Sequence, residues 1–158
     1  MPSELELDHH FWNTISTSLE FRTWLLSKTK FASLGLRLVT DEKWHQRWYR
    51  DPITKKDSET DILLMFAHPA TEERYALHIE NKPDHRGWEP LQPENYKKRA
   101  VDRMLKWRYV DFQTVLLASK AFISRSTTEA AHFDVLITYE EVSHFVPAFG
   151  VSQLNAIE

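Results

Sequence analysis

Residues 60–82 read TDILLMFAHPATEERYALHIENK, and this stretch predicts the centre of the fold. Residues 60–68 form a near-continuous apolar run, which is typical of a strand buried on both faces. Residues 74–82 alternate apolar and polar side chains, as a half-buried strand does. The short connection HPAT at residues 68–71 predicts that the two strands form an antiparallel hairpin.

The rest of the chain predicts further strands and helices around this hairpin. A helix is expected over residues 9–29, where apolar side chains recur at three-to-four spacing and Asp8 is a candidate N-cap. Residues 34–39 and 43–51 are both candidate first strands, and we favour the second. The other expected elements are a helix at 90–110 and strands at 112–122 and 133–142, with a loop or short helix between these strands. This order predicts an α/β fold, a mixed sheet with flanking helices.

Length and composition are typical of one soluble intracellular domain. A chain of 158 residues suffices for one domain with a proper core, so a single domain over 1–158 is expected. The absence of cysteine excludes disulfides, thiolate zinc sites and a cysteine nucleophile. No apolar run approaches the roughly 20 residues that span a bilayer, and the N-terminus lacks a signal-peptide core. We therefore expect a cytoplasmic protein that does not contact membranes.

Three ionisable residues are expected to meet at one end of the predicted hairpin. Glu80 and Lys82 lie on the same face of their strand, because side chains alternate. Hairpin pairing brings Asp61, at the start of the first strand, beside them. Two neighbouring carboxylates repel each other unless a cation lies between them, and Mg²⁺ or Mn²⁺ accepts such oxygen ligands. The pattern predicts a divalent-metal site, although an E-x-K triplet alone is also common on solvated strands.

These residues and their order resemble the PD-(D/E)XK nuclease superfamily. Asp61 is followed 19 residues later by the triplet Glu80-Asn81-Lys82, and Gln92 and Tyr96 fit a Q-x-x-x-Y motif of helicase-associated and exonuclease-like members. The resemblance covers about residues 9–142 and implies a restriction-endonuclease-like αβββαβ core.

The chain also departs from the family pattern at two positions. Thr60 stands where the family motif has proline. Gln92 precedes Pro93, and a residue before proline is disfavoured in helical conformation. The second departure predicts that Gln92 is the N-cap of its helix rather than a residue inside it.

The resemblance implies a role for each motif residue. Asp61 and Glu80, with the backbone carbonyl of Asn81, would hold Mg²⁺, for which Mn²⁺ substitutes. Lys82 would orient the attacking water and stabilise charge on the phosphate. Glu20, in the first predicted helix, is a candidate further ligand, as first-helix glutamates are in some members, and the alternative is a solvent-facing residue.

Basic and aromatic residues after the motif are candidates for nucleic-acid contacts. Arg99, Arg103 and Lys106 fall on one stripe of the predicted helix, where cations would hold backbone phosphates. Arg86 and Trp88 lie in the preceding loop and are candidates for contacts with a phosphate and a base. The alternatives are a merely solvated basic face and a loop anchored by a buried tryptophan.

The sequence therefore predicts a metal-dependent nuclease that hydrolyses phosphodiester bonds, with DNA as the favoured substrate. The net charge of −3 argues against binding nucleic acid through the overall charge of the protein, but a local cluster of cations can still bind phosphate. Because the sequence shows no evident recognition domain, we expect the protein to be a homodimer, a subunit of a larger complex, or an enzyme with little sequence preference. Restriction or defence is the most frequent role in the family. Two alternatives stay open: a catalytically silent nuclease-fold module that binds nucleic acid or assembles with partners, and an unrelated α/β interaction protein.

Overall fold

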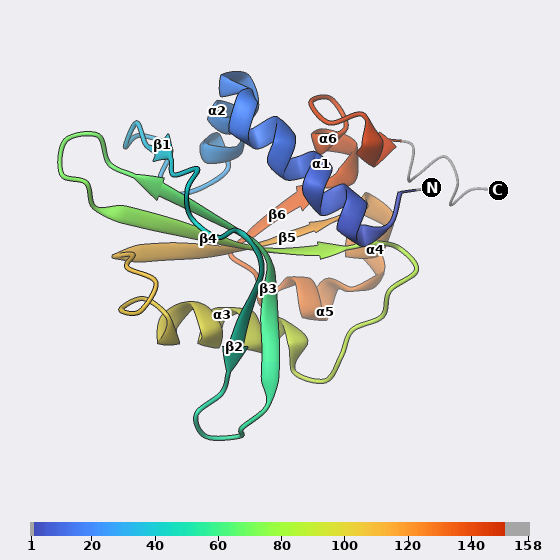
Figure 1. The fold of residues 1–158 in the computed structure, drawn as a ribbon. Helices are drawn as coiled ribbons and strands as arrows, with labels where there is room; N and C mark the ends of the chain where they lie inside the picture. The colour runs from blue at the N-terminus through green and yellow to red at the C-terminus, as the bar shows by residue number, and fades with distance from the viewer. Residues whose placement is uncertain (1, 151–158) are drawn as a thin grey trace.

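The computed structural model describes residues 2–150, which form a six-stranded mixed sheet with helices on both faces (Figure 1). The predicted α/β class, with a mixed sheet and flanking helices, is confirmed. The elements in chain order are α1 (Glu4–Thr17), α2 (Leu19–Ser27), β1 (Arg37–Leu38), β2 (His45–Arg50), β3 (Asp57–Ala67), β4 (Arg74–Lys82), α3 (Gln92–Asp102), β5 (Asp111–Ala118), α4 (Lys120–Arg125), α5 (Thr127–Ala130), β6 (Val135–Thr138) and α6 (Tyr139–Val142).

The sheet is organised around the predicted hairpin of β3 and β4. The strand order is β1-β3-β4-β5-β6, and β2 pairs with the first part of β3. Pairing is antiparallel from β1 or β2 to β3 and from β3 to β4, and parallel from β4 to β5 and β6. Helix α3 provides the crossover between the parallel strands β4 and β5. In Figure 1 the β2–β3 hairpin extends away from the other strands.

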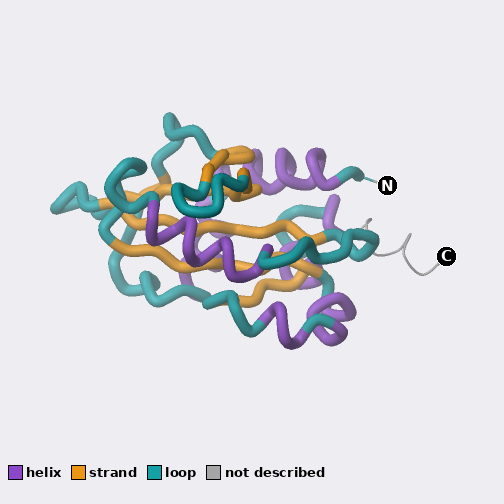
Figure 2. Tube along the Cα trace, turned by 90° about the horizontal axis from the view of Figure 1, so that it is seen from below, coloured by secondary structure: helices purple, strands orange, loops and turns teal. Residues whose placement is uncertain are grey.

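Both faces of the central strands are covered, which explains the continuous apolar run of β3. Ile62 and Leu64 of β3 pack with Leu77 of β4 into a core formed with α1 and α2. Leu63 of β3 and Ala76 of β4 pack on the opposite face, the face that α3 covers. The view from below in Figure 2 shows α3 lying across the strands. By the same alternation, Glu80 and Lys82 face α3.

The first predicted helix, over residues 9–29, is in fact two helices. Ser18 ends α1 and is the N-cap of α2, where its hydroxyl accepts a backbone N–H. Helix α1 begins earlier than expected, after Ser3, which forms a capping box with Glu6. The prediction of Asp8 as the N-cap was therefore wrong, since Asp8 is buried within α1.

The second predicted helix, over residues 90–110, ends at Asp102. The chain then turns through residues 103–108, which brings Trp107 and Tyr109 against Leu63 under the sheet. Burying these two aromatic rings favours the turn over a continued helix.

Two predicted strands are shorter than expected because each leads directly into a helix. The strand predicted at 112–122 ends at Ala118, and Ser119 is the N-cap of α4. The strand predicted at 133–142 spans only β6, after which Thr138 forms a capping box that starts α6. Apolar residues recur on both sides of each junction, so periodicity alone did not reveal the hydroxyl cap.

Asp51 holds the turn of the β2–β3 hairpin against α3. Its carboxylate accepts the backbone N–H groups of Ile53 and Thr54 at 2.8 and 3.1 Å, and the ammonium of Lys98 on α3. The hydrogen bond from Lys98, followed by the two backbone hydrogen bonds, lowers the pKa of Asp51 to about 2. The contacts of the folded state therefore stabilise the ionised form of Asp51.

Replacing Asp51 with asparagine is expected to destabilise the protein at neutral pH and to matter less in acid. The folded-state pKa lies below the unfolded value of about 3.9, so the contribution is present above about pH 4 and lost as the pH falls toward 2. Urea unfolding at pH 7 and pH 3 measures the change. Asp41→Asn, at an exposed position, is the control, and a pH-independent difference between Asp51→Asn and wild type would contradict the assignment.

Candidate functional site

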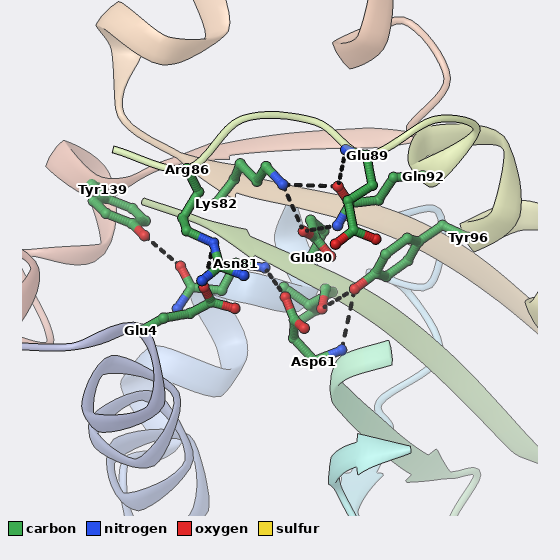
Figure 3. A network of polar contacts seen from close by, with 11 residues as sticks. Glu4, Asp61, Glu80, Asn81, Lys82, Arg86, Glu89, Gln92, Tyr96 and Tyr139 are labelled. Atoms are coloured by element: carbon green, nitrogen blue, oxygen red, sulfur yellow. Dashed lines mark hydrogen bonds and ion pairs between the residues drawn. The ribbon is translucent and has the colours of Figure 1, made fainter. Parts of the chain in front are cut away.

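The antiparallel register of β3 and β4 places Asp61 beside Glu80. The paired part of this hairpin ends at Ile62 and Ile79, and Asp61 and Glu80 are the residues directly next to that last pair. The Asp61 carboxylate accepts the backbone N–H of Asn81 at 3.0 Å. Figure 3 shows Asp61, Glu80 and Lys82 converging at this end of the hairpin. The structure therefore brings the three predicted catalytic residues together.

Gln92 joins the ammonium of Lys82 to the carboxylate of Glu80. The amide oxygen of Gln92 accepts from Lys82 Nζ at 2.8 Å, and its amide nitrogen donates to Glu80 Oε1 at 2.8 Å. Lys82 Nζ also lies 3.6 Å from Glu80 Oε1 and 4.7 Å from the ring centre of Trp88. These contacts supply a buried ammonium with the partners that it needs.

The backbone before α3 explains how Gln92 reaches this position despite Pro93. The N-cap of α3 is Leu91, so the prediction of Gln92 as the N-cap was wrong, and Gln92 is the first residue of the helix. Leu91 has a φ of 62°, in the left-handed region. A non-glycine residue is strained in this conformation. The strained turn thus lets the helix begin at Gln92 and direct its side chain to the site.

Tyr96 lies one helical turn after Gln92 and contacts the start of β3. Its hydroxyl accepts the backbone N–H of Asp61 at 3.1 Å and lies 3.4 Å from the carbonyl oxygen of Ile79. Burial first, and then the charges of Asp61 and Glu80, raise the pKa of Tyr96 well above its usual value. The phenol is therefore neutral and retains its proton for hydrogen bonding.

The two carboxylates are buried and repel each other. Burial, followed by the charge of Glu80, raises the pKa of Asp61 well above its usual value. Burial also raises the pKa of Glu80, against the lowering effects of Tyr96 and Lys82. Within residues 2–150, the only ion pair that involves either carboxylate is the one between Lys82 and Glu80. Among these residues no cation pairs with the Asp61 carboxyl, so burial beside Glu80 disfavours its ionised form in the metal-free protein.

The donor set of this pair fits Mg²⁺ or Mn²⁺, which take hard oxygen ligands. A cation between Asp61 and Glu80 would relieve their repulsion. Among residues 2–150, no group of three or more His, Cys, Asp and Glu side chains is arranged to hold a metal ion. Further ligands would therefore be backbone carbonyls, water and phosphate oxygens, which is how Mg²⁺ is usually bound in proteins.

The site opens into a cavity of about 520 Å³ between the ends of β3 and β4, the loop after β4 and α3. Carboxylates and cations both line it, so the cavity is polar rather than apolar. Its charged and polar lining includes Glu4, Lys56, Asp61, Glu80, Lys82, Arg86, Gln92, Tyr96 and Arg99.

Two of the five predicted nucleic-acid contacts line this cavity, namely Arg86 and Arg99. Arg86 is exposed and lies 3.7 Å from the Glu4 carboxylate. Arg99 is buried, and its guanidinium donates to the hydroxyls of Thr60 and Ser58 at 2.7 and 2.8 Å. Its third nitrogen, Nη2, has no hydrogen-bond partner among the described residues.

The structure does not bring the other three predicted contacts to the cavity lining described above. Arg103 and Lys106 follow the end of α3, so the helical stripe that would have aligned them with Arg99 does not continue. Arg103 instead lies 4.8 Å from the ring centre of Tyr49. Trp88 packs against the rings of Phe122 and Phe133, and Lys82 Nζ lies over its ring.

Glu20 lies on α2, is exposed, and is not among the described residues that line the cavity. The glutamate that the first helix contributes is Glu4, at the start of α1. Sequence reasoning missed it because the helix was expected to begin at residue 9. The capping box formed by Ser3 and Glu6 is the local signal that could have located the true start.

Asn81 extends from the site into a buried network on the opposite face of the sheet. Its amide nitrogen donates to Asp8 at 2.7 Å, and its amide oxygen accepts from the Tyr139 hydroxyl. His45 lies 3.0 Å from the same Asp8 carboxylate. Burial raises the pKa of Asp8 to about 7, although the bond from Asn81 lowers it. The network anchors the middle residue of the E-x-K triplet to α1 and α6.

His78, on the same face as Glu80, belongs to a directional chain of hydrogen bonds. Arg99 can only donate, so Thr60 accepts from it at 2.7 Å and donates to His78 Nδ1 at 2.9 Å. His78 Nε2 then donates to the Tyr109 hydroxyl at 3.1 Å, which donates to the carbonyl of Ala100. Burial, and then the charge of Arg99, lowers the pKa of His78 well below its usual value. His78 is thus a neutral structural residue.

Replacing Thr60 with valine is expected to cost about 1–3 kcal/mol of unfolding free energy. The change nearly preserves shape but leaves a buried arginine donor and a buried histidine nitrogen without their shared partner. Denaturant unfolding measures the loss. Thr60→Ser keeps the hydroxyl and is expected to stay close to wild type, so equal stabilities of the two variants would refute the chain of bonds.

No protein-family model matches the sequence, and no curated protein or solved structure is significantly similar to it. A nuclease family is therefore a proposal that rests on the motif residues and their geometry. Within residues 2–150, no helix is both long and apolar enough to cross a membrane.

Proposed function

We propose that this chain is a metal-dependent nuclease of the PD-(D/E)XK type that hydrolyses phosphodiester bonds, with DNA as the favoured substrate. The observation that carries the proposal is the meeting of Asp61, Glu80 and Lys82 with Gln92 and Tyr96 in one polar cavity. The order of elements, with three antiparallel strands followed by a helical crossover to β5, supports a restriction-endonuclease-like fold.

The carboxylates of Asp61 and Glu80, with the backbone carbonyl of Asn81, would hold the metal ion. Bound there, Mg²⁺ or Mn²⁺ polarises a phosphate oxygen and lowers the pKa of a bound water. The burial of both carboxylates supports this assignment, as does the lack of an ion-pair partner for Asp61 within the described part of the chain.

Lys82 supplies positive charge where negative charge develops on the phosphate. Its ammonium is held in position by Gln92 and Glu80, so little reorganisation is needed during the reaction. Gln92 holds the ammonium with its amide oxygen, which is an acceptor, while its amide nitrogen, which can only donate, binds Glu80. Gln92 and Tyr96 are therefore positioning residues in this proposal, acting through Lys82 and Asp61.

The cations of the cavity would bind the backbone of the substrate. Arg99 is only 1% exposed, and its Nη2 donor has no partner among residues 2–150, which costs free energy unless a ligand accepts from it. A phosphate oxygen is an acceptor of the required charge. Arg86, on the loop across the cavity, and Lys56, on the β2–β3 hairpin, provide further positive charge.

Cleavage assays with Mg²⁺, Mn²⁺ or EDTA test the proposal. The substrates are single-stranded DNA, linear duplex DNA, supercoiled plasmid and single-stranded RNA, and the plasmid separates internal cutting from cutting at ends. We expect DNA cleavage that requires a divalent metal. Cleavage that survives EDTA, or cleavage of RNA alone, would refute the reaction as proposed. Binding without cleavage would instead identify a catalytically silent module.

A further inference from the structure

We propose that the cavity accepts an unpaired nucleotide whose base stacks on Trp48, so that the substrate is single-stranded or locally melted nucleic acid. The inference rests on the proposed nuclease function and defines the substrate class of the same site. Its evidence comes from the β2–β3 hairpin, which contributed nothing to the sequence motifs.

Trp48 is a large aromatic side chain exposed at the site itself. Its side chain projects from β2, is 56% exposed, and lines the same cavity as Asp61 and Glu80. Trp48 pairs with Glu59, two positions before Asp61 on β3, so the hairpin places it beside the metal-site carboxylates. An exposed indole at the edge of a polar cavity offers a π-face to a base.

The indole of Trp48 is held in place although it is exposed. The neighbouring Asp57 carboxylate accepts from Arg50 Nε and Nη2 at 2.8 and 3.2 Å, and Arg50 first, with a smaller contribution from Trp48, lowers the pKa of Asp57. The Arg50 guanidinium in turn lies 5.7 Å from the centre of the Trp48 ring. A ring that is already ordered loses little conformational entropy when a base stacks on it. Trp48 therefore has the properties of a preorganised stacking platform.

The dimensions and charge of the cavity favour one unpaired nucleotide over an intact duplex. A volume of about 520 Å³ suits a single small-molecule-sized group. Glu80 and Lys82 are only 3% exposed, so a strand must enter the cavity to reach them. A base pair resists this because unpairing costs free energy, whereas an unpaired strand enters freely. Arg86 and Arg99 then lie where the entering backbone needs cations.

The test compares cleavage of a single strand, a matched duplex, and the same duplex with a short mismatched bubble. For the wild type, we expect kcat/KM to be at least about 10-fold higher on the single strand and the bubble than on the duplex. Trp48→Ala is expected to lower kcat/KM on the unpaired substrates by roughly 5- to 150-fold, mainly through KM. Trp48→Phe should retain most of the activity, because it keeps an aromatic face.

Ile53→Ala is the matched control, since Ile53 is 81% exposed on the same hairpin but is not among the described cavity-lining residues. It is expected to behave as wild type. Equal cleavage of single strand and duplex by the wild type, or an unchanged KM in Trp48→Ala, would overturn the inference.

If no substrate is cleaved, the nuclease proposal fails, and fluorescence anisotropy with a labelled single strand then tests Trp48 separately. Weaker binding by Trp48→Ala supports the stacking site without catalysis, and equal binding overturns it.

Discussion

Replacing Lys82 with methionine is expected to lower kcat for DNA cleavage by about 100- to 1000-fold. Methionine keeps much of the length of the side chain but removes the ammonium that Gln92 and Glu80 hold. The charge that stabilises the developing phosphate negative charge is then lost, whereas the carboxylates that would hold the metal remain. Single-turnover cleavage with saturating protein measures the chemical step without a contribution from binding.

Lys106→Met is the matched control for this change. Lys106 lies on an exposed segment after α3 and is not among the described residues that line the cavity, so full activity is expected. Because Lys82→Met also leaves Glu80 buried without its cation, thermal unfolding must first show that the variant is folded at the assay temperature. A folded Lys82→Met protein with wild-type kcat would remove Lys82 from the mechanism.

Asp61→Asn is expected to abolish cleavage and at the same time to stabilise the metal-free protein by about 1–3 kcal/mol. The carboxylate is buried next to Glu80, and no described cation pairs with it. An asparagine oxygen can still accept the backbone N–H of Asn81, so the change removes a repulsive charge without leaving that donor unpaired. Calorimetry in EDTA should show a Tm increase of roughly 2–10 °C.

The response to metal provides the second measurement on this variant. A ligand that binds only the folded state raises Tm, so Mn²⁺ is expected to stabilise the wild type and to have little effect on Asp61→Asn. Asp41→Asn, which removes an exposed carboxylate elsewhere, should respond like the wild type. Destabilisation by Asp61→Asn, or equal stabilisation of all three proteins by Mn²⁺, would contradict a metal site at Asp61.

The opposite expected effects on stability distinguish a functional site from a structural ion pair. In a structural pair, removing either partner destabilises the protein. Here Lys82→Met is expected to destabilise the protein, whereas Asp61→Asn is expected to stabilise it, because none of the cations in residues 2–150 forms an ion pair with Asp61. Such a gain of stability on loss of activity is the usual consequence of a binding site that accumulates charge for its ligand.

The sequence by itself determined the central hairpin and the meeting of its polar residues. Side-chain alternation along a strand depends only on local backbone geometry, so Glu80 and Lys82 had to share a face. The continuous apolar run of β3 indicated that this strand is buried on both faces. The short connection between β3 and β4 predicted that they pair antiparallel, as they do. Antiparallel pairing then determined that Asp61 lies beside Glu80.

Only the tertiary structure decided which other residues reach that meeting point. The left-handed backbone at Leu91 allows Gln92 to start α3, and burial of Trp107 ends the helical stripe before Lys106. Glu4 rather than Glu20 reaches the cavity, because a hydroxyl cap divides the first helical segment in two. The position of Trp48 at the cavity depends on the pairing of β2 with β3. These positions are set by packing between distant segments, which short-range periodicity does not record.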